Sequence, residues 1–223
     1  MRALSVVVVA VSLLVGARAW AEDFQPGVHY AELPIPVDTT SPGKVEVVEL
    51  FSYGCIHCYQ FEDALESWRK GQSGDVVFRR VPAVFNDQFA YLAQVFYAAE
   101  ALGVTDRVHT PLFEAIHDKQ ADLRDPNLLA SIFTSSANVS GEELIKVLNS
   151  FSVRSRVQQA DGYGRMYALT GVPSLVVNGK YRVDGRMAGN NTRMLQVVDQ
   201  LVERERAALA APATAKASAP AGR

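Results

Sequence analysis

The only two cysteines of this 223-residue chain, Cys55 and Cys58, follow directly on an apolar run that begins at Val45. An apolar run followed by a helical pattern places the first cysteine where a strand ends and a helix begins. Backbone N–H groups and the positive end of the helix dipole then converge on the Cys55 sulfur and favour its thiolate. The two-residue spacing lets Cys58 close a disulfide with Cys55 within one helical turn. The pair is therefore predicted to be a redox centre.

Two other uses of a cysteine pair fit the sequence less well. A structural zinc site needs about four ligands, whereas the chain has no further cysteine, and His29, His109 and His117 show no paired ligand spacing. A purely structural disulfide gains little from closing so short a loop, because the entropic stabilisation grows with loop length. We therefore expect no metal site, and a redox-active disulfide with no other cofactor.

Residues 1–21 have the pattern of a secretory signal peptide. Arg2 precedes an apolar core over residues 4–15, and Ala19-Trp20-Ala21 has the form of an A-x-A cleavage site. The apolar core is short for a transmembrane span, and a bare N-terminal anchor is the alternative. We expect the mature protein to be exported to a compartment in which disulfides persist.

The charge balance of the chain is mildly acidic. It contains 22 Lys and Arg and 24 Asp and Glu, which gives a net charge of −2. Removal of the signal peptide takes away Arg2 and Arg18 and no acid, which moves the net charge to about −4. This argues against nucleic-acid binding. The mature length suffices for one packed domain, or for one domain with a sub-domain.

Strand signals occur in two separated blocks, and the first block is a βαβ unit. It has an expected strand over 45–53, a helix over 55–70 and a strand over 76–81. Within the helix, Phe61, Leu65 and Trp68 follow helical spacing and form an apolar face that would pack on the sheet. The second block opens at Pro173, and Asn178-Gly179 joins two short apolar runs, which is the strongest short hairpin signal. A last helix is expected over 192–209.

The long stretch between the two blocks is predicted to be helical. Apolar residues from Phe89 to Tyr97 keep helical spacing, and Asp125-Pro126 has the form of an N-cap followed by proline at the first helical position. Ser140 and Glu143 form a capping box ahead of another apolar pattern. We interpret the aromatic residues of this stretch as core packing and not as a cofactor pocket.

A βαβ unit with C-x-x-C at its first strand-to-helix junction, completed by a ββα unit that opens with proline, resembles the thioredoxin fold. The chain most resembles the DsbA-type periplasmic thiol:disulfide oxidoreductases, and the likeness covers residues 24–201. The matching motifs are Val48-Glu49-Leu50-Phe51-Ser52-Tyr53, Cys55-x-His57-Cys58-Tyr59-Gln60-Phe61-Glu62, Gly171-Val172-Pro173 and Val177-Asn178-Gly179-Lys180-Tyr181.

This resemblance predicts an α/β thioredoxin fold with an inserted helical sub-domain. The thioredoxin-like domain would comprise residues 22–84 and 170–209, and the helical insertion residues 85–169. From Ala207 onward the chain is almost all Ala, Pro, Ser, Thr and Gly. This composition predicts a disordered tail, which we place outside the folded domain at 210–223.

The resemblance also implies a function. It predicts a monomeric periplasmic oxidant that donates the Cys55–Cys58 disulfide to unfolded exported proteins and is reoxidised by a quinone-linked membrane oxidase of the DsbB type. A disulfide isomerase or reductase of the same fold is an alternative. Exported isomerases of the superfamily carry a dimerisation domain ahead of the catalytic one, and too few residues precede Cys55 for that. A peptide-binding, chaperone-like module is a further alternative.

Individual residues take expected roles from the resemblance. Cys55 would be the attacked sulfur and Cys58 the buried leaving group, while His57 would help to stabilise the Cys55 thiolate. Val172-Pro173 matches the family's cis-proline loop, which would face the cysteines and bind a substrate strand through the Val172 backbone. Where familiar members have proline this chain has Ile56, which supplies an extra N–H near the sulfur.

Two acidic residues near the cysteines need separate interpretations. Glu49 lies in a mostly apolar strand, so we expect it to be buried beneath the site and to exchange a proton with Cys58. An ion pair with Arg79 or Arg80 is the alternative, and the two roles are compatible. Glu62 matches a family acid near the site, but a solvated helix position fits it at least as well, and we leave it out of the site.

Overall fold

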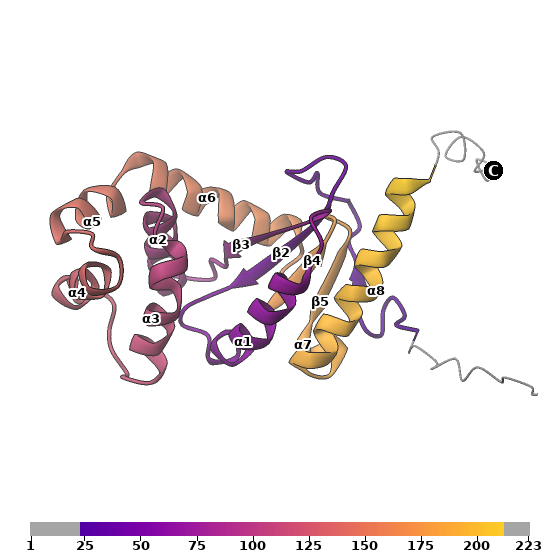
Figure 1. Cartoon of the computed structure of the whole chain (residues 1–223), viewed down its shortest axis with the longest axis horizontal. Helices are drawn as coiled ribbons and strands as arrows, with labels where there is room; N and C mark the ends of the chain where they lie inside the picture. Colours follow the sequence, from indigo (N-terminus) through magenta and orange to yellow (C-terminus); the bar gives the residue numbers. More distant parts are fainter. Residues whose placement is uncertain (1–22, 212–223) are drawn as a thin grey trace, which may run out of the picture.

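The computed structural model describes residues 23–211, so the predicted signal peptide and nearly all of the predicted tail lie outside the described residues. The described chain contains five strands and eight helices (Figure 1). The strands are β1 (Ala31–Glu32), β2 (Val45–Phe51), β3 (Val76–Pro82), β4 (Ser174–Val177) and β5 (Tyr181–Asp184). The helices are α1 (Ile56–Gly71), α2 (Asp87–Ala101), α3 (Thr105–His117), α4 (Pro126–Ala137), α5 (Gly141–Leu148), α6 (Phe151–Met166), α7 (Gly185–Ala188) and α8 (Asn191–Ala210).

The five strands form one mixed sheet in the order β1-β5-β4-β2-β3. Strands β2 and β3 run parallel, joined by α1, and place Glu49 opposite Arg80. Strand β4 pairs antiparallel with β2 on its other side, and β5 pairs antiparallel with β4. Strand β2 is therefore buried between β3 and β4, and the predicted βαβ and ββα units share one sheet.

Side chains of β2 alternate between two apolar cores. Val47 packs with Phe61 and Leu65 of α1 and with Val197 of α8, so α1 and α8 cover one face of the sheet. Val48 belongs to the second core, which consists mainly of side chains from the helices α2–α6. Figure 1 shows these helices gathered beyond one side of the sheet, with α6 running back toward the strands. The C-terminal end of β2, where Cys55 follows, lies at the junction of the two cores.

The hairpin between β4 and β5 has the predicted turn. Asn178 and Gly179 have φ angles of 50° and 62°, the left-handed values that a tight two-residue turn requires. A Cβ atom on Gly179 would lie 1.8 Å from the carbonyl oxygen of Val37. Glycine is therefore required here for both the backbone angle and the close approach of the chain.

Helix capping in the insertion agrees with the sequence, and one helix lacks the local signals that mark α4 and α5. Asp125 and Ser140 accept hydrogen bonds from the first backbone N–H groups of α4 and α5. Helix α3 lies in the stretch predicted to be helical, but its bounds were not predicted, because its N-cap residue Val104 forms no side-chain cap and Pro111 lies in its interior. The division into domains at residues 84/85 and 169/170 remains a prediction.

The C-terminal helix confirms the helix predicted over 192–209, but it overturns the start of the expected disordered tail. Helix α8 continues through Ala210, so residues 207–210 are helical and the expectation of disorder from Ala207 onward is wrong for them. Alanine has the highest helix propensity, and the buried face of α8 extends to Glu205, which anchors the last turns. Within residues 23–211, no helix is long and apolar enough to cross a membrane.

Candidate active site around Cys55 and Cys58

Cys55 is the N-cap residue of α1, directly after the end of β2. Its Sγ accepts a hydrogen bond of 3.3 Å from the backbone N–H of Cys58. Both cysteines are free thiols, with Cys55 partly exposed and Cys58 completely buried. The predicted strand-to-helix placement is thus confirmed, and one sulfur of the pair is open to attack while the other is shielded.

The two thiols have opposite acidities. A hydrogen bond from the Cys58 side chain is the largest cause that lowers the pKa of Cys55, which falls to about 6. Burial opposes this, whereas the backbone N–H groups of Cys58 and His57 and the charge of His57 lower the pKa further. The Ile56 N–H is not among these groups. Burial raises the pKa of Cys58 well above its usual range, assisted by Cys55 and Glu49.

The predicted proline loop faces the cysteines. The Val172–Pro173 peptide bond is cis, as the resemblance implied. The Cys55 thiol donates a hydrogen bond of 3.4 Å to the carbonyl oxygen of Val172. The loop and the N-terminus of α1 therefore meet at Cys55, although 117 residues separate the two partners in sequence.

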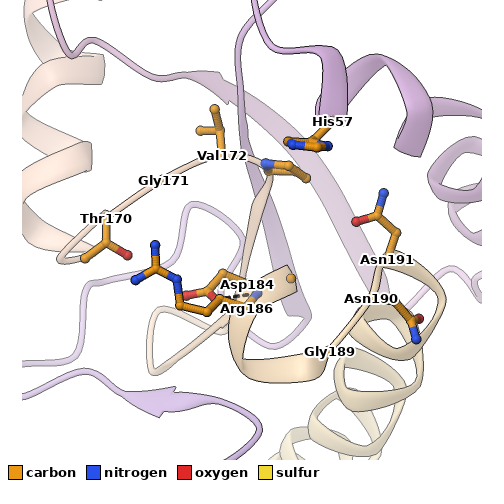
Figure 2. Close-up of a pocket in the computed structure, with 11 residues that line it drawn as sticks. His57, Thr170, Gly171, Val172, Asp184, Arg186, Gly189, Asn190 and Asn191 are labelled. Atoms are coloured by element: carbon orange, nitrogen blue, oxygen red, sulfur yellow. Dashed lines mark hydrogen bonds between the residues drawn. The ribbon is translucent and has the colours of Figure 1, made fainter.

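His57 is exposed and lines a pocket of about 460 Å³ beside the loop. The same pocket is bounded by residues 170–173 and by residues of the segment 184–191, which joins β5 to α8. Figure 2 shows His57 on one side of this pocket and the Thr170–Val172 backbone on another. The structure thus brings together five of the six predicted site residues, Cys55, Cys58, His57, Val172 and Pro173, at one end of the sheet.

Glu49 lies below them and is completely buried. Its Oε2 accepts a hydrogen bond of 2.8 Å from Arg80 Nε, while Arg79 approaches Glu46 instead. Burial raises the pKa of Glu49 to about 7, against the opposing effect of Arg80. The second carboxylate oxygen has no hydrogen-bond partner among the described residues. Burial of Glu49 and its ion pair with Arg80 are therefore confirmed, whereas proton exchange with Cys58 remains a prediction.

Comparison with known proteins identifies the family. The DSBA-like thioredoxin domain matches residues 46–202. The thiol:disulfide interchange protein DsbA of Pseudomonas aeruginosa is 41% identical over 199 residues, which cover 89% of this chain and 94% of that protein. The corresponding protein of Azotobacter vinelandii is 44% identical over 186 residues, covering 83% of this chain and 86% of that protein.

The chain belongs to the DsbA family. It is a protein thiol:disulfide oxidoreductase with the thioredoxin fold and an inserted helical region, as predicted. A crystal structure of Pseudomonas aeruginosa DsbA matches it with a TM-score of 0.78 and 40% identity, covering 83% of this chain and 96% of that one. DsbA of Xylella fastidiosa matches with a TM-score of 0.75 and 37% identity, covering 80% and 96% of the two chains.

In this DsbA family member, Glu62 is not a solvated helix residue. It is buried, and its Oε1 lies 2.6 Å from Arg80 Nη2. Arg80 Nη2 also lies 2.8 Å from Oε1 of Glu66. One buried guanidinium thus binds three carboxylates, those of Glu49, Glu62 and Glu66, so the solvated interpretation of Glu62 is wrong. The cause is the β2–β3 register, which places Arg80 beneath α1.

The sequence interpretation also missed two residues that extend this network. His109 of α3 is buried, with Nε2 3.3 Å from Glu62 Oε1 and Nδ1 2.9 Å from the hydroxyl of Tyr53. Burial lowers the pKa of His109, which keeps the ring neutral at pH 7. His109 lies on the apolar face of α3, whose bounds were not predicted. Only its position beside Val108 and Leu112 could have indicated burial.

The described residues show no group of three or more His, Cys, Asp or Glu side chains that could hold a metal ion. The residues gathered at the site supply two thiols and neighbouring acids. The Cys55 thiolate can act as a nucleophile or leaving group near pH 7, and Cys58 exchanges its proton in a buried environment.

Proposed function

We propose that this protein is a disulfide oxidase that donates the Cys55–Cys58 disulfide to exported proteins as they fold. The observation that carries the proposal is the asymmetry of the pair: Cys55 is accessible with a pKa of about 6, whereas the pKa of buried Cys58 is raised well above its usual range. Stabilisation of the Cys55 thiolate favours the reduced protein, and a stable reduced form makes the disulfide form an oxidant.

The proposed reaction begins with a substrate thiolate that attacks Sγ of Cys55 in the oxidised protein. The Cys55–Cys58 bond breaks, and Cys58 takes the electron pair and a proton. A second substrate thiolate then attacks the substrate sulfur of the mixed disulfide, and the Cys55 thiolate leaves. The substrate gains one disulfide and loses two electrons and two protons, and the protein becomes the dithiol.

Glu49 is the proposed proton donor and acceptor for Cys58. It is buried near that thiol, its charge contributes to the pKa of Cys58, and its own pKa of about 7 suits proton exchange at neutral pH. His57 is proposed to assist as a nearby positive charge that favours the Cys55 thiolate. Arg80 holds Glu49 in place through its hydrogen bond.

Val172 and Pro173 are proposed to bind the substrate backbone. Pro173 has no backbone N–H, so it cannot donate a hydrogen bond to a neighbouring strand of the protein. The backbone of Val172 is therefore available to an extended substrate peptide that lies across Cys55. Backbone recognition of this kind is independent of side chains, which suits an enzyme with many unfolded substrates.

The remaining features of the proposal concern the cellular setting. Residues 1–21 would direct export to the periplasm, where a quinone-linked membrane oxidase of the DsbB type would accept two electrons from the dithiol and restore the disulfide. The protein would act as a monomer, without nucleic acid, metal or any cofactor other than its own disulfide.

The proposal is tested with a reduced two-cysteine peptide and the oxidised mature protein. We expect one peptide disulfide for each protein disulfide consumed, and no oxidation by Cys55→Ser. The reduced Cys58→Ser variant should form a stable mixed disulfide with an oxidised peptide, because it lacks the resolving thiol. Rearrangement of wrongly paired disulfides without net oxidation would instead indicate an isomerase. Full activity of the Cys55→Ser/Cys58→Ser protein would indicate a chaperone-like module.

A further inference from the structure

The pocket beside Cys55 has one wall made by the chain between β5 and α8. This segment contributes Asp184, Arg186 and Asn191 to the lining, opposite His57 and the loop at Val172. In the view of Figure 2, the Arg186 side chain extends from this segment toward Thr170. A polypeptide held on the loop would therefore lie along the pocket that Arg186 also lines.

Arg186 carries an uncompensated charge, although an acid lies two residues before it. Asp184 Oδ1 accepts hydrogen bonds from the backbone N–H groups of Arg186 and Met187, and Asp184 Oδ2 lies 3.8 Å from Nε of Arg182. Within residues 23–211, no hydrogen bond or ion pair involves the Arg186 guanidinium. Arg186 is exposed, so its five N–H donors are available to a ligand.

The size and composition of the pocket suit one polar side chain and a short stretch of backbone. Three residues of extended chain span about 10 Å, and the pocket offers a volume of about 460 Å³. The lining contains one carboxylate, already engaged by backbone N–H groups, and the free cation of Arg186. A carboxylate is the planar acceptor that a guanidinium binds best.

We propose that Arg186 is a specificity-determining residue that pairs with an acidic side chain of the substrate within three residues of its reacting cysteine. The inference rests on the proposed function, because it requires a substrate strand on the Val172–Pro173 loop. The pair lies at the exposed edge of a pocket, so its contribution is modest and depends on ionic strength.

The test uses reduced two-cysteine peptides that differ only by Asp or Asn. One pair carries the change two residues before the first cysteine, and the other pair two residues after it. For the oxidised wild-type protein we expect kcat/KM to favour Asp by about threefold in at least one pair at low salt. The preference should shrink in about 0.5 M salt.

Arg186→Gln should lose the preference, whereas Arg186→Lys should keep part of it. Arg107→Gln is the matched control. It removes an exposed arginine of α3, far along the chain from the pocket, and should keep the full preference for Asp. Equal rates for Asp and Asn in both pairs, or a preference that persists in Arg186→Gln, would overturn the inference. In either case, oxidation of the Asn peptides by the wild type would leave the proposed function standing. Failure to oxidise any peptide would reject the proposed function itself.

Discussion

In the reduced protein, the free energy of unfolding should depend on pH through the Cys55 thiol. The disulfide form has no such thiol and should lack this dependence. The pKa of Cys55 is about 6 in the folded dithiol, against a usual value near 9. A lowered folded-state pKa adds stability that is complete above the unfolded-state value and is lost as pH falls through the folded-state value. The effect therefore grows from about pH 6 to about pH 9.

The magnitude follows from these two pKa values. Between pH 5 and pH 8, linkage gives an increase of about 2.6 kcal/mol in the free energy of unfolding of the dithiol form. Cys55 is partly exposed, and solvent screening reduces this to about 1.5 kcal/mol. For a chain of this size the change corresponds to about 3 to 6 °C in Tm. Glu49 titrates in both redox forms, so its contribution largely cancels in their difference.

Thermal unfolding of the oxidised and reduced proteins at pH 5 and pH 8 measures this difference. The Tm of the reduced form relative to the oxidised form should rise by those few degrees at the higher pH. Cys55→Ser, studied under reducing conditions, is the control and should follow the pH profile of the oxidised protein. A Tm difference that is constant with pH, or that grows toward pH 5, would refute the reasoning.

Three further outcomes are expected from substitutions around the pair. Glu49→Gln should slow thiol exchange about tenfold near pH 7, while ultraviolet absorbance of the thiolate shows an almost unchanged Cys55 pKa; equal rates across pH would assign Glu49 a structural role only. His57→Ser should raise the Cys55 pKa only slightly and leave it well below 9, since the charge of His57 is the smallest of the causes that lower it and the backbone N–H of residue 57 is retained; an unchanged midpoint would remove His57 from the site. Arg80→Met should cost about 3 to 5 kcal/mol in urea unfolding, because it leaves Glu49 and Glu62 buried without their cation, and a loss below about 1 kcal/mol would contradict the buried network.

Local signals were sufficient for much of the fold. The cysteine pair at the end of an apolar strand, the Asn178-Gly179 turn and the caps at Asp125 and Ser140 each depend on residues a few positions apart. Their physical causes are local backbone angles and hydrogen bonds, which sequence spacing determines directly. Helix α3 lacked such signals, since Val104 offers no capping side chain and Pro111 interrupts the helical pattern.

The buried acids show where sequence reasoning stops. Burial of Glu49 could be predicted from its apolar strand, but the partners of Arg80 depend on the parallel register of β2 and β3 and on the position of α1 above it. The helical pattern alone places Glu62 on a solvated face, because its partner Arg80 lies on a strand 18 residues further along the chain. The contact between Cys55 and Val172 spans a still longer separation and was accessible only through family resemblance.

Equilibration of the Cys55–Cys58 pair with glutathione at pH 7 tests the central claim most directly. The Cys55 thiolate stabilises the reduced protein, which raises the reduction potential of the pair by about 30 mV for each 1.4 kcal/mol. In a glutathione buffer poised at about −200 mV, the account predicts that the pair is mainly dithiol. A pair that remains mainly disulfide in that buffer would contradict the assignment as an oxidase.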